Sequence, residues 1–292
     1  MLRCPLSAFS ALLTLCSGLA RAFPADPIPA PPAPRVKTTV MQLSDPQGDS
    51  LLVVPDACQA RACPLLLVSH PYGAMPAYGL DFKGHATYAG FLERFLASDY
   101  VLLLSLDGGK ETWGNDLALE YDLRVWNHAQ TLFDYSGETF TLGISMGALS
   151  ATLLGMTGRI PVRAGVLIAG VLSPPALYRG KNPAYPGSIA RAYGLPTQGA
   201  TDAQLAFALT PHDPVGGTLF FRRPDLPFLA VASSEDTGVK LEQHSAAFIS
   251  SILPFSPQSA LLTVKGPHLS APHFSETVSN AALEFLARFR SR

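Results

Sequence analysis

The stretch that decides the fold is Phe140-Thr141-Leu142-Gly143-Ile144-Ser145-Met146-Gly147-Ala148-Leu149-Ser150-Ala151. Its first three residues are typical of the end of a buried strand and its last four of the start of a helix, so the G-x-S-x-G segment between them predicts a sharp turn. A serine at such a turn has its hydroxyl forced up at the carboxyl edge of a sheet. Glycine is needed on both sides because side chains there would collide with the neighbouring strand and helix. Ser145 is therefore the candidate nucleophile, and the alternative is a tight turn with an incidental serine.

Short apolar runs rich in β-branched residues surround this turn on both sides along the chain. Several are continuous, such as Leu65–Val68 and Val101–Leu104, which is typical of strands buried on both faces of a sheet. Eight strands are predicted: Thr38–Ser44, Leu51–Val54, Pro64–Ser69, Tyr100–Leu106, Thr139–Ile144, Ala164–Val171, Pro227–Ala232 and Ala260–Val264.

Helical patterns alternate with these strands, which favours an α/β protein with a mostly parallel eight-stranded sheet and helices on both faces. The predicted helices are Tyr88–Ala97, Asp116–Phe133, Met146–Met156, Val239–Ile252 and Ser275–Arg288. The turn Asp45-Pro46-Gln47-Gly48 predicts an antiparallel hairpin at one end of the sheet.

One connection, residues 173–226, is too long for a simple crossover. It carries many prolines and glycines and two weak helical patterns, at Ser188–Tyr193 and Asp202–Leu209. Loops longer than about 15 residues are usually functional lids or binding loops. We expect a cap-like insertion after the sixth strand; the alternative is a segment that only covers a sheet edge.

A serine hydroxyl needs a base and an acid that orients the base. His268 follows the last strand, as Ser145 follows its own, and is favoured over His273, which lies just before the final helix. Asp236 ends the strand before and is favoured over its neighbour Glu235 as the orienting acid. The predicted triad is Ser145, Asp236 and His268. The remaining candidates His85, His128 and His244 fit hydrogen-bonded surface histidines.

These residues resemble the α/β-hydrolase family, whose triad follows the order nucleophile, acid, histidine. The resemblance spans the chain from about Val36 to Arg288 and implies an α/β-hydrolase fold. It also implies two oxyanion-hole donors, the N–H of Met146 after the nucleophile and the N–H of Tyr72 in the loop after the third strand.

That loop, His70-Pro71-Tyr72-Gly73-Ala74, is similar to the family's His-Gly-x-Gly pattern but has Pro71 where glycine is usual. Proline has no N–H and cannot donate, and His70 is expected to shape the loop rather than act as the base. The loop after the fourth strand contains Trp113, which is predicted either to line a substrate pocket or to pack as a structural residue.

The first 22 residues are predicted to be a secretory signal peptide. Arg3 precedes an apolar stretch from Leu6 to Ala20, and Ala20-Arg21-Ala22 fits a cleavage site. The stretch is shorter than the ~20 residues that span a bilayer, so a membrane anchor is the weaker alternative, as is lipid attachment at Cys16. Residues 23–35 form a proline-rich leader, and the hydrolase domain is expected over residues 36–292.

The predicted export also bears on how the cysteines pair. Cleavage leaves only Cys58 and Cys63, and two cysteines so close together in an exported chain predict one local disulfide. Two free thiols are the alternative, and a metal site is disfavoured because no other Cys or His lies nearby in the sequence.

Composition removes several function classes. The chain has 292 residues, 48% apolar and 15% charged, with a formal net charge of −1. This excludes a disordered chain, and it argues against a nucleic-acid partner, which calls for a basic surface. Nucleotide-binding motifs are missing from the sequence, so no cofactor and no metal is expected.

The sequence therefore predicts an exported, secreted or periplasmic serine hydrolase that cleaves a small-molecule or polymeric ester through an acyl-enzyme. No membrane span is expected in the mature chain. The alternatives are a serine peptidase or acyltransferase with the same triad, and a non-catalytic binding protein on the same scaffold.

Overall fold

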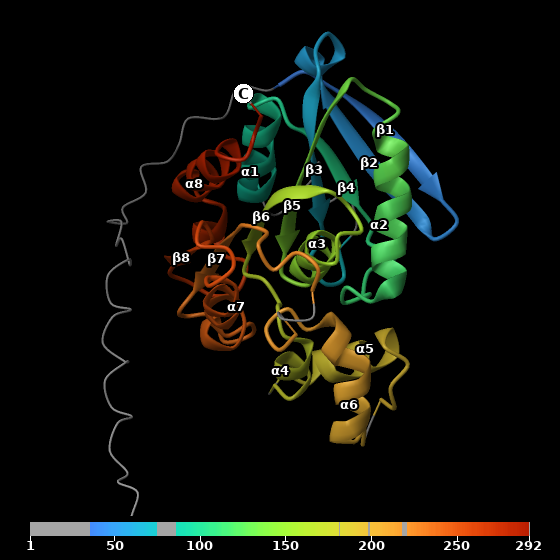
Figure 1. Ribbon diagram of the computed structural model, residues 1–292, viewed down its shortest axis with the longest axis vertical. Helices are drawn as coiled ribbons and strands as arrows, with labels where there is room; N and C mark the ends of the chain where they lie inside the picture. Colours follow the sequence, from blue (N-terminus) through green and yellow to red (C-terminus); the bar gives the residue numbers. More distant parts are fainter. Residues whose placement is uncertain (1–35, 75–85, 181, 198, 218–220, 292) are drawn as a thin grey trace, which may run out of the picture. The chain divides into compact units, whose positions relative to one another are not determined.

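The computed structural model describes residues 36–74, 86–180, 182–197, 199–217 and 221–291 (Figure 1). The predicted signal peptide, residues 1–22, and the proline-rich leader, residues 23–35, lie outside the described residues. Residues 36–291, with the gaps just given, form one sheet flanked by helices.

The sheet has eight strands in the order β1-β2-β4-β3-β5-β6-β7-β8. Its first pairings, β1 with β2 and β2 with β4, are antiparallel, and the others are parallel. The mostly parallel eight-stranded sheet predicted from the sequence is thereby confirmed. The strands are β1 (Thr38–Asp45), β2 (Gly48–Pro55), β3 (Cys63–Ser69), β4 (Val101–Ser105), β5 (Tyr135–Ile144), β6 (Val162–Ile168), β7 (Phe228–Ser233) and β8 (Ala260–Val264).

The hairpin is also as predicted, since Asp45 pairs with Gly48 across the turn between β1 and β2. Every residue of β3 and β4 is buried, as the continuous apolar runs require of strands covered on both faces.

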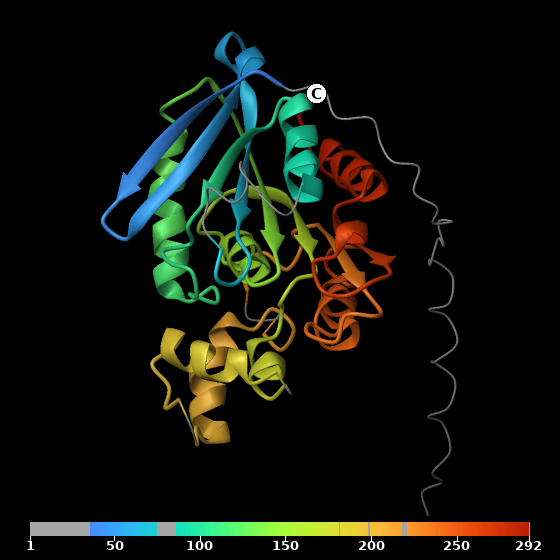
Figure 2. The same cartoon turned by 180° about the vertical axis from the view of Figure 1, so that it is seen from behind.

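Helices cover both faces of this sheet. On one face α1 (Ala86–Ala97) and α8 (Glu276–Ala287) pack together, and their phenylalanines share a core with Phe140 of β5. On the other face lie α2 (Asp116–Ala129), α3 (Gly147–Met156) and α7 (Ser245–Ile252). Figures 1 and 2 show these two layers from opposite sides.

Two predicted helices are shorter than expected. The helix predicted to reach Phe133 ends at Ala129. In the helix predicted from Val239, only a 3₁₀ turn, Leu241–Gln243, precedes α7. His244, with φ −123° and ψ −90°, separates the two because its backbone cannot continue a helix.

The long insertion folds into three helices rather than two. These are α4 (Pro174–Tyr178), α5 (Ala184–Ala192) and α6 (Asp202–Leu209), followed by a 3₁₀ turn at Thr210–His212. The helix at Asp202 begins and ends as predicted, whereas α4 was not predicted because its two leading prolines suggest a loop. Proline is in fact compatible with the first turn of a helix, where the N–H has no partner to lose. Figures 1 and 2 show α4–α6 gathered at the end of the sheet to which the parallel strands point.

A disulfide joins Cys58 and Cys63, as predicted, with the Cα atoms 5.6 Å apart. Both cysteines are buried, and they close the connection between β2 and β3. The bridge constrains only a short loop, so its stabilising effect in the chain-entropy picture is small.

We predict that replacing both cysteines by alanine lowers the free energy of unfolding by about 2 kcal/mol, from the entropy of closing so short a loop. For a domain of this size the melting temperature should fall by roughly 4–8 °C, as calorimetry would measure. Alanine is chosen because serine would bury two hydroxyls. The matched control is the unaltered chain under reducing conditions, which should melt with the double variant; an unchanged melting temperature in both would show that the bridge contributes nothing.

Candidate active site

Ser145 occupies a strained turn between β5 and α3. Its φ is +52°, in the left-handed region that costs a non-glycine residue roughly 1–2 kcal/mol. Backbone hydrogen bonds hold it there, from the Ser145 N–H to the Ile168 carbonyl (2.9 Å) and from the Val171 N–H to the Ser145 carbonyl (2.9 Å). The turn predicted from the sequence is therefore present, and the strain is maintained by neighbouring β6.

The two glycines of the turn leave no room for a side chain. A Cβ on Gly143 would lie 2.5 Å from the Cα of Ala148, and one on Gly147 would overlap the carbonyl oxygen of Ser69. Both contacts are with backbone atoms, which cannot move aside. The same close approach brings the start of α3 against the end of β3.

The structure brings Ser145, His268 and Asp236 into one hydrogen-bonded relay. Ser145 Oγ is 2.9 Å from His268 Nε2, and His268 Nδ1 is 2.6 Å from Asp236 Oδ2. The other carboxylate oxygen, Oδ1, accepts from the N–H groups of Gly238 (2.8 Å) and Val239 (2.9 Å). Asp236 follows β7 and His268 follows β8, so all three side chains come from the carboxyl edge of the sheet.

The two residues kept as alternatives lie elsewhere. Glu235 is exposed, and His273 is fully buried with Nδ1 3.5 Å from the Ser270 hydroxyl. Neither belongs to the relay.

The charge on Asp236 is stabilised by its partners. Burial alone would raise the pKa of this carboxyl, but the hydrogen bond from His268, its positive charge and the two backbone N–H groups outweigh burial and hold the pKa below its usual value. An anionic Asp236 keeps the proton of His268 on Nδ1, which leaves Nε2 free to accept the proton of Ser145.

The two N–H groups predicted as oxyanion-hole donors belong to Met146 and Tyr72. Met146 precedes α3, where the first N–H groups have no intrahelical acceptor. Tyr72 lies in the loop after β3, where the next two N–H groups are taken by Lys110 O (2.9 Å, from Gly73) and Pro71 O (3.1 Å, from Ala74). Among the described residues, no acceptor is bonded to the N–H of either Met146 or Tyr72.

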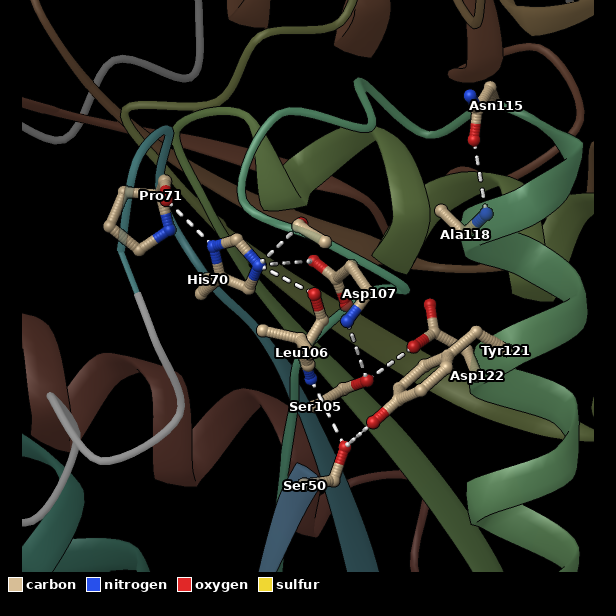
Figure 3. Close-up of polar contacts among 11 residues, drawn as sticks. Ser50, His70, Pro71, Ser105, Leu106, Asp107, Asn115, Ala118, Tyr121 and Asp122 are labelled. Atoms are coloured by element: carbon tan, nitrogen blue, oxygen red, sulfur yellow. Dashed lines mark hydrogen bonds and ion pairs between the residues drawn. The ribbon is translucent and has the colours of Figure 1, made fainter. Parts of the chain in front are cut away.

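His70 is a loop-shaping residue, as the sequence predicted. Its side chain is buried, and its ring nitrogens meet the carbonyl oxygens of Pro71 (2.7 Å), Leu106 (2.8 Å) and Gly109 (3.2 Å) (Figure 3). It thus ties the loop after β3 to the loop after β4.

Trp113 fits the packing alternative rather than an open pocket wall, because its side chain is only 1% exposed. Its indole N–H donates to Ser188 Oγ (2.7 Å), and its ring lies against those of Tyr72 (centroids 5.2 Å apart) and Tyr185 (5.5 Å). Tyr72 and Tyr185 are half-buried and also contact each other edge to face. Tyr185 was not identified from the sequence, since a tyrosine in a proline-rich loop carries no motif.

The insertion is fastened to the loop after β4. Ser188 Oγ donates to Glu111 Oε2 (2.8 Å), which also pairs with Arg191 (3.0 Å), while the Tyr193 hydroxyl donates to Trp113 O (2.6 Å). Burial raises the pKa of Tyr185, and the charge of Asp236 raises it further, which places this ring within the electrostatic reach of the relay.

His244 is the prediction that the structure corrects. It was expected at the surface but is 1% exposed, and its Nδ1 accepts the N–H groups of Leu172 (3.3 Å) and Ser173 (3.2 Å), where the insertion begins. Burial lowers its pKa to about 4, although the charge of Asp236 acts in the opposite direction. Of the other two, His128 is exposed and His85 lies outside the described residues.

Left-handed backbone is concentrated around the site. Six non-glycine residues of the described chain have positive φ, and five follow the carboxyl ends of β4, β5, β6 and β8. These five are Asp107, Trp113, Ser145, Ala169 and Leu269.

Within the described ranges, no group of three or more His, Cys, Asp or Glu side chains could hold a metal ion. Nor is any helix of the described chain long and apolar enough to cross a membrane.

Comparison with known proteins gives a clear result for the fold. No family model matches the sequence, and no curated protein does. Solved structures do match. The fluorophosphonate-binding serine hydrolase FphF of Staphylococcus aureus is 14% identical, covering 87% of this chain and 99% of that one, with a TM-score of 0.64.

Two further structures are similar over most of their length. The esterase Pf2001 of Pyrococcus furiosus is 15% identical over 87% of this chain and 93% of its own, with a TM-score of 0.58. Carboxyl esterase 2 of Tuber melanosporum is 16% identical over 87% and 88%, also with a TM-score of 0.58. Together with the strand order, these likenesses show that the chain has the α/β-hydrolase fold.

We predict that His244 makes the protein less stable in acid. Because its pKa is about 4 when folded and near 6.5 when unfolded, the unfolded chain binds the extra proton between these values. Stability should therefore fall as pH drops, by about 2 kcal/mol between pH 7 and pH 5 from this residue.

Urea unfolding of the natural chain and of His244→Gln at both pH values measures this difference, which the variant should lack. His128→Gln, on an exposed histidine, should keep the full pH dependence. An identical slope in all three proteins would contradict the assignment.

Proposed function

We propose that this protein is an exported serine hydrolase that cleaves carboxylic esters through an acyl-enzyme on Ser145. The observation that carries the proposal is the relay itself, Ser145 Oγ to His268 Nε2 at 2.9 Å and His268 Nδ1 to Asp236 Oδ2 at 2.6 Å. Both lengths are those of hydrogen bonds competent for proton transfer.

The first half of the reaction forms the acyl-enzyme. Ser145 Oγ attacks the ester carbonyl carbon as its proton moves to His268 Nε2, and Asp236 stabilises the resulting imidazolium without taking its proton. The carbonyl oxygen gains negative charge and accepts hydrogen bonds from the N–H groups of Met146 and Tyr72. The C–O bond to the alcohol then breaks, and the alcohol leaves with the proton from His268.

The second half reverses the roles with water. His268 removes a proton from a water molecule, the hydroxide attacks the acyl carbon, and the same two N–H groups stabilise the second oxyanion. When the bond to Ser145 breaks, His268 returns the proton to Oγ, so the enzyme is regenerated and the acid is released.

An ester substrate and export are supported by independent features. The similar structures include two named as esterases and one as a fluorophosphonate-binding serine hydrolase. The predicted signal peptide and the Cys58–Cys63 disulfide both suit a secreted or periplasmic enzyme, because disulfides persist in oxidising compartments.

We predict that Ser145→Ala abolishes both hydrolysis and labelling by a fluorophosphonate probe, which reacts with an activated serine. The loss in kcat should approach the roughly 10⁶-fold known for removal of a triad serine, measured with p-nitrophenyl esters. Ser98→Ala, on a half-buried serine in the turn after α1, should label and turn over normally. Equal labelling of both variants would remove Ser145 as the nucleophile, and faster cleavage of peptide amides than of esters would make the protein a peptidase.

We further propose that the insertion, residues 173–226, caps the site and sets which acyl groups fit. Its helix α5 brings Tyr185 against Tyr72, whose own N–H is an oxyanion donor in the mechanism above. We expect the two rings to adjoin the reacting carbonyl. A ring in this position limits the space beside the acyl group.

Tyr185→Ala is therefore expected to shift the preferred acyl chain length, measured as the ratio of kcat/KM for long and short p-nitrophenyl esters, by about tenfold. The matched control is Phe207→Ala, because Phe207 lies in α6 of the same insertion but is 88% exposed. If both variants keep the original chain-length profile, the insertion has no part in specificity.

A further inference from the structure

Three ionisable side chains lie buried behind the loop that carries Tyr72, and none takes part in the relay. His70 is 5% exposed, while Asp107 and Asp122 are fully buried. Figure 3 shows them together: His70 follows β3, Asp107 follows β4, and Asp122 lies on α2. Their arrangement calls for a physical explanation, because buried charges are stable only when paired.

The ring of His70 faces acceptors on both sides. Nδ1 lies 2.7 Å from Pro71 O, and Nε2 lies 2.8 Å from Leu106 O and 3.2 Å from Gly109 O. A carbonyl oxygen can only accept, so both ring nitrogens must carry hydrogen to satisfy these contacts. The geometry thus favours the imidazolium, whose positive charge has a counter-ion close by in Asp107, with Oδ2 4.0 Å from Nε2.

The two carboxyl groups are short of donors. Ser105 Oγ donates to Asp122 Oδ1 and accepts from the Asp107 N–H (3.0 Å). The other three carboxyl oxygens receive no hydrogen bond of regular geometry from the described residues. The two carboxyls also lie close enough to interact with each other. Two buried anions side by side would repel, whereas one proton between them removes the repulsion and supplies a donor.

The same conclusion follows from the titration of the pair. Burial raises the pKa of Asp107 to about 7, even though Ser69 and other nearby donors act to lower it. Burial also raises the pKa of Asp122 well above its usual value, and the charge of Asp107 raises it further. Asp122 is thus the better holder of the proton.

We propose that protonated Asp122 donates to anionic Asp107, and that Asp107 and the His70 imidazolium then form a neutral buried unit that positions the Tyr72 N–H. The positioning step rests on the proposed function, in which Tyr72 is an oxyanion donor. The sharing of a proton does not depend on that function.

The link from His70 to Tyr72 is a single peptide group. Pro71 C=O and Tyr72 N–H belong to the same planar trans unit, so they point in opposite directions. When His70 Nδ1 holds the Pro71 oxygen, it also fixes the direction of the Tyr72 N–H. The charge state of the unit is thereby coupled to the oxyanion hole.

Other titratable groups near the pair stay neutral over the working range. Tyr88 of α1 and Tyr121 of α2 both face Asp107, and burial raises the pKa of each, to about 12 for Tyr121. The hydroxyl of Tyr121 bonds to Ser50 Oγ (2.8 Å) and Gly48 O (2.9 Å) rather than to a carboxylate. The pH response of this region therefore belongs to the two aspartates.

The first test measures melting temperature against pH for the natural chain and for Asp122→Asn. A carboxyl with a raised pKa binds a proton when folded that the unfolded chain has lost above about pH 4, so stability falls as pH rises through this window. The amide of Asp122→Asn donates to Asp107 at every pH, so the variant should gain on the natural chain steadily from pH 5 to pH 8.

Asp116→Asn is the matched control, because Asp116 lies on the same helix and its side chain is 65% exposed. Its melting curve should keep the pH slope of the natural chain. A constant offset between Asp122→Asn and the natural chain at all pH values would overturn proton sharing. Infrared difference spectra give a check that needs no activity: the C=O band of a protonated, buried carboxyl should be present in the natural chain at pH 8, above the pKa of Asp107, and lost in Asp122→Asn.

The second test is kinetic. Asp107→Asn leaves the His70 imidazolium without its counter-ion, so the Tyr72 N–H should be misplaced and kcat should fall by roughly 10- to 100-fold with little change in KM, less than the loss of a whole oxyanion donor. Asp122→Asn at pH 8, where Asp107 is anionic, should keep the natural kcat, because its amide replaces the donor. Equal kcat losses in the two variants, or no loss in Asp107→Asn, would overturn the positioning role.

Failure of the proposed function gives a different pattern. In that case the natural chain neither hydrolyses esters nor labels with a fluorophosphonate, while the melting and infrared measurements still decide whether the proton is shared. If Asp107→Asn does not fold, the melting and infrared measurements on Asp122→Asn decide whether the proton is shared.

Discussion

The requirement on which the rest of the structure depends is that positions 143 and 147 have no room for a side chain. The left-handed turn at Ser145 is held between a strand and a helix so close together that an added Cβ would overlap backbone atoms at either glycine. Because α3 approaches β3 at Gly147, the helix start and the loop of Tyr72 lie next to each other. The positions of the nucleophile and of both proposed oxyanion donors therefore depend on the close contact between α3 and β3.

The sheet, its hairpin and its five flanking helices could be predicted from the sequence because each depends on local pattern. Buried parallel strands such as Leu65–Val68 are short, continuously apolar runs, which is the pattern expected of strands covered on both faces. The position at the strand end also favoured Asp236 over Glu235, because parallel strands bring their carboxyl ends to the same edge of the sheet. What a local pattern cannot show is contact between distant segments.

Apart from α4 and the two shortened helices, the unpredicted features are contacts of that kind. His244 looks like a surface residue in sequence, yet it accepts two N–H groups from a segment 71 and 72 positions away. Tyr185 becomes relevant only because the insertion folds back onto Trp113. Asp107 and Asp122 read as ordinary charged residues in a loop and on a helix, and only the structure shows that both are enclosed. Burial of a charge depends on the tertiary structure, and no sequence motif predicts it.

The cluster of left-handed residues along the carboxyl edge has an evolutionary consequence. Each left-handed residue destabilises the fold by roughly 1 kcal/mol or more. The five residues together therefore cost an amount comparable to the whole net stability of a typical domain. Ser145 must keep its conformation, but Ala169, whose N–H bonds to Val231 O at 2.7 Å, has no contact with the relay among its hydrogen bonds. A lineage living at higher temperature could place glycine there and tolerate heat better without altering its chemistry.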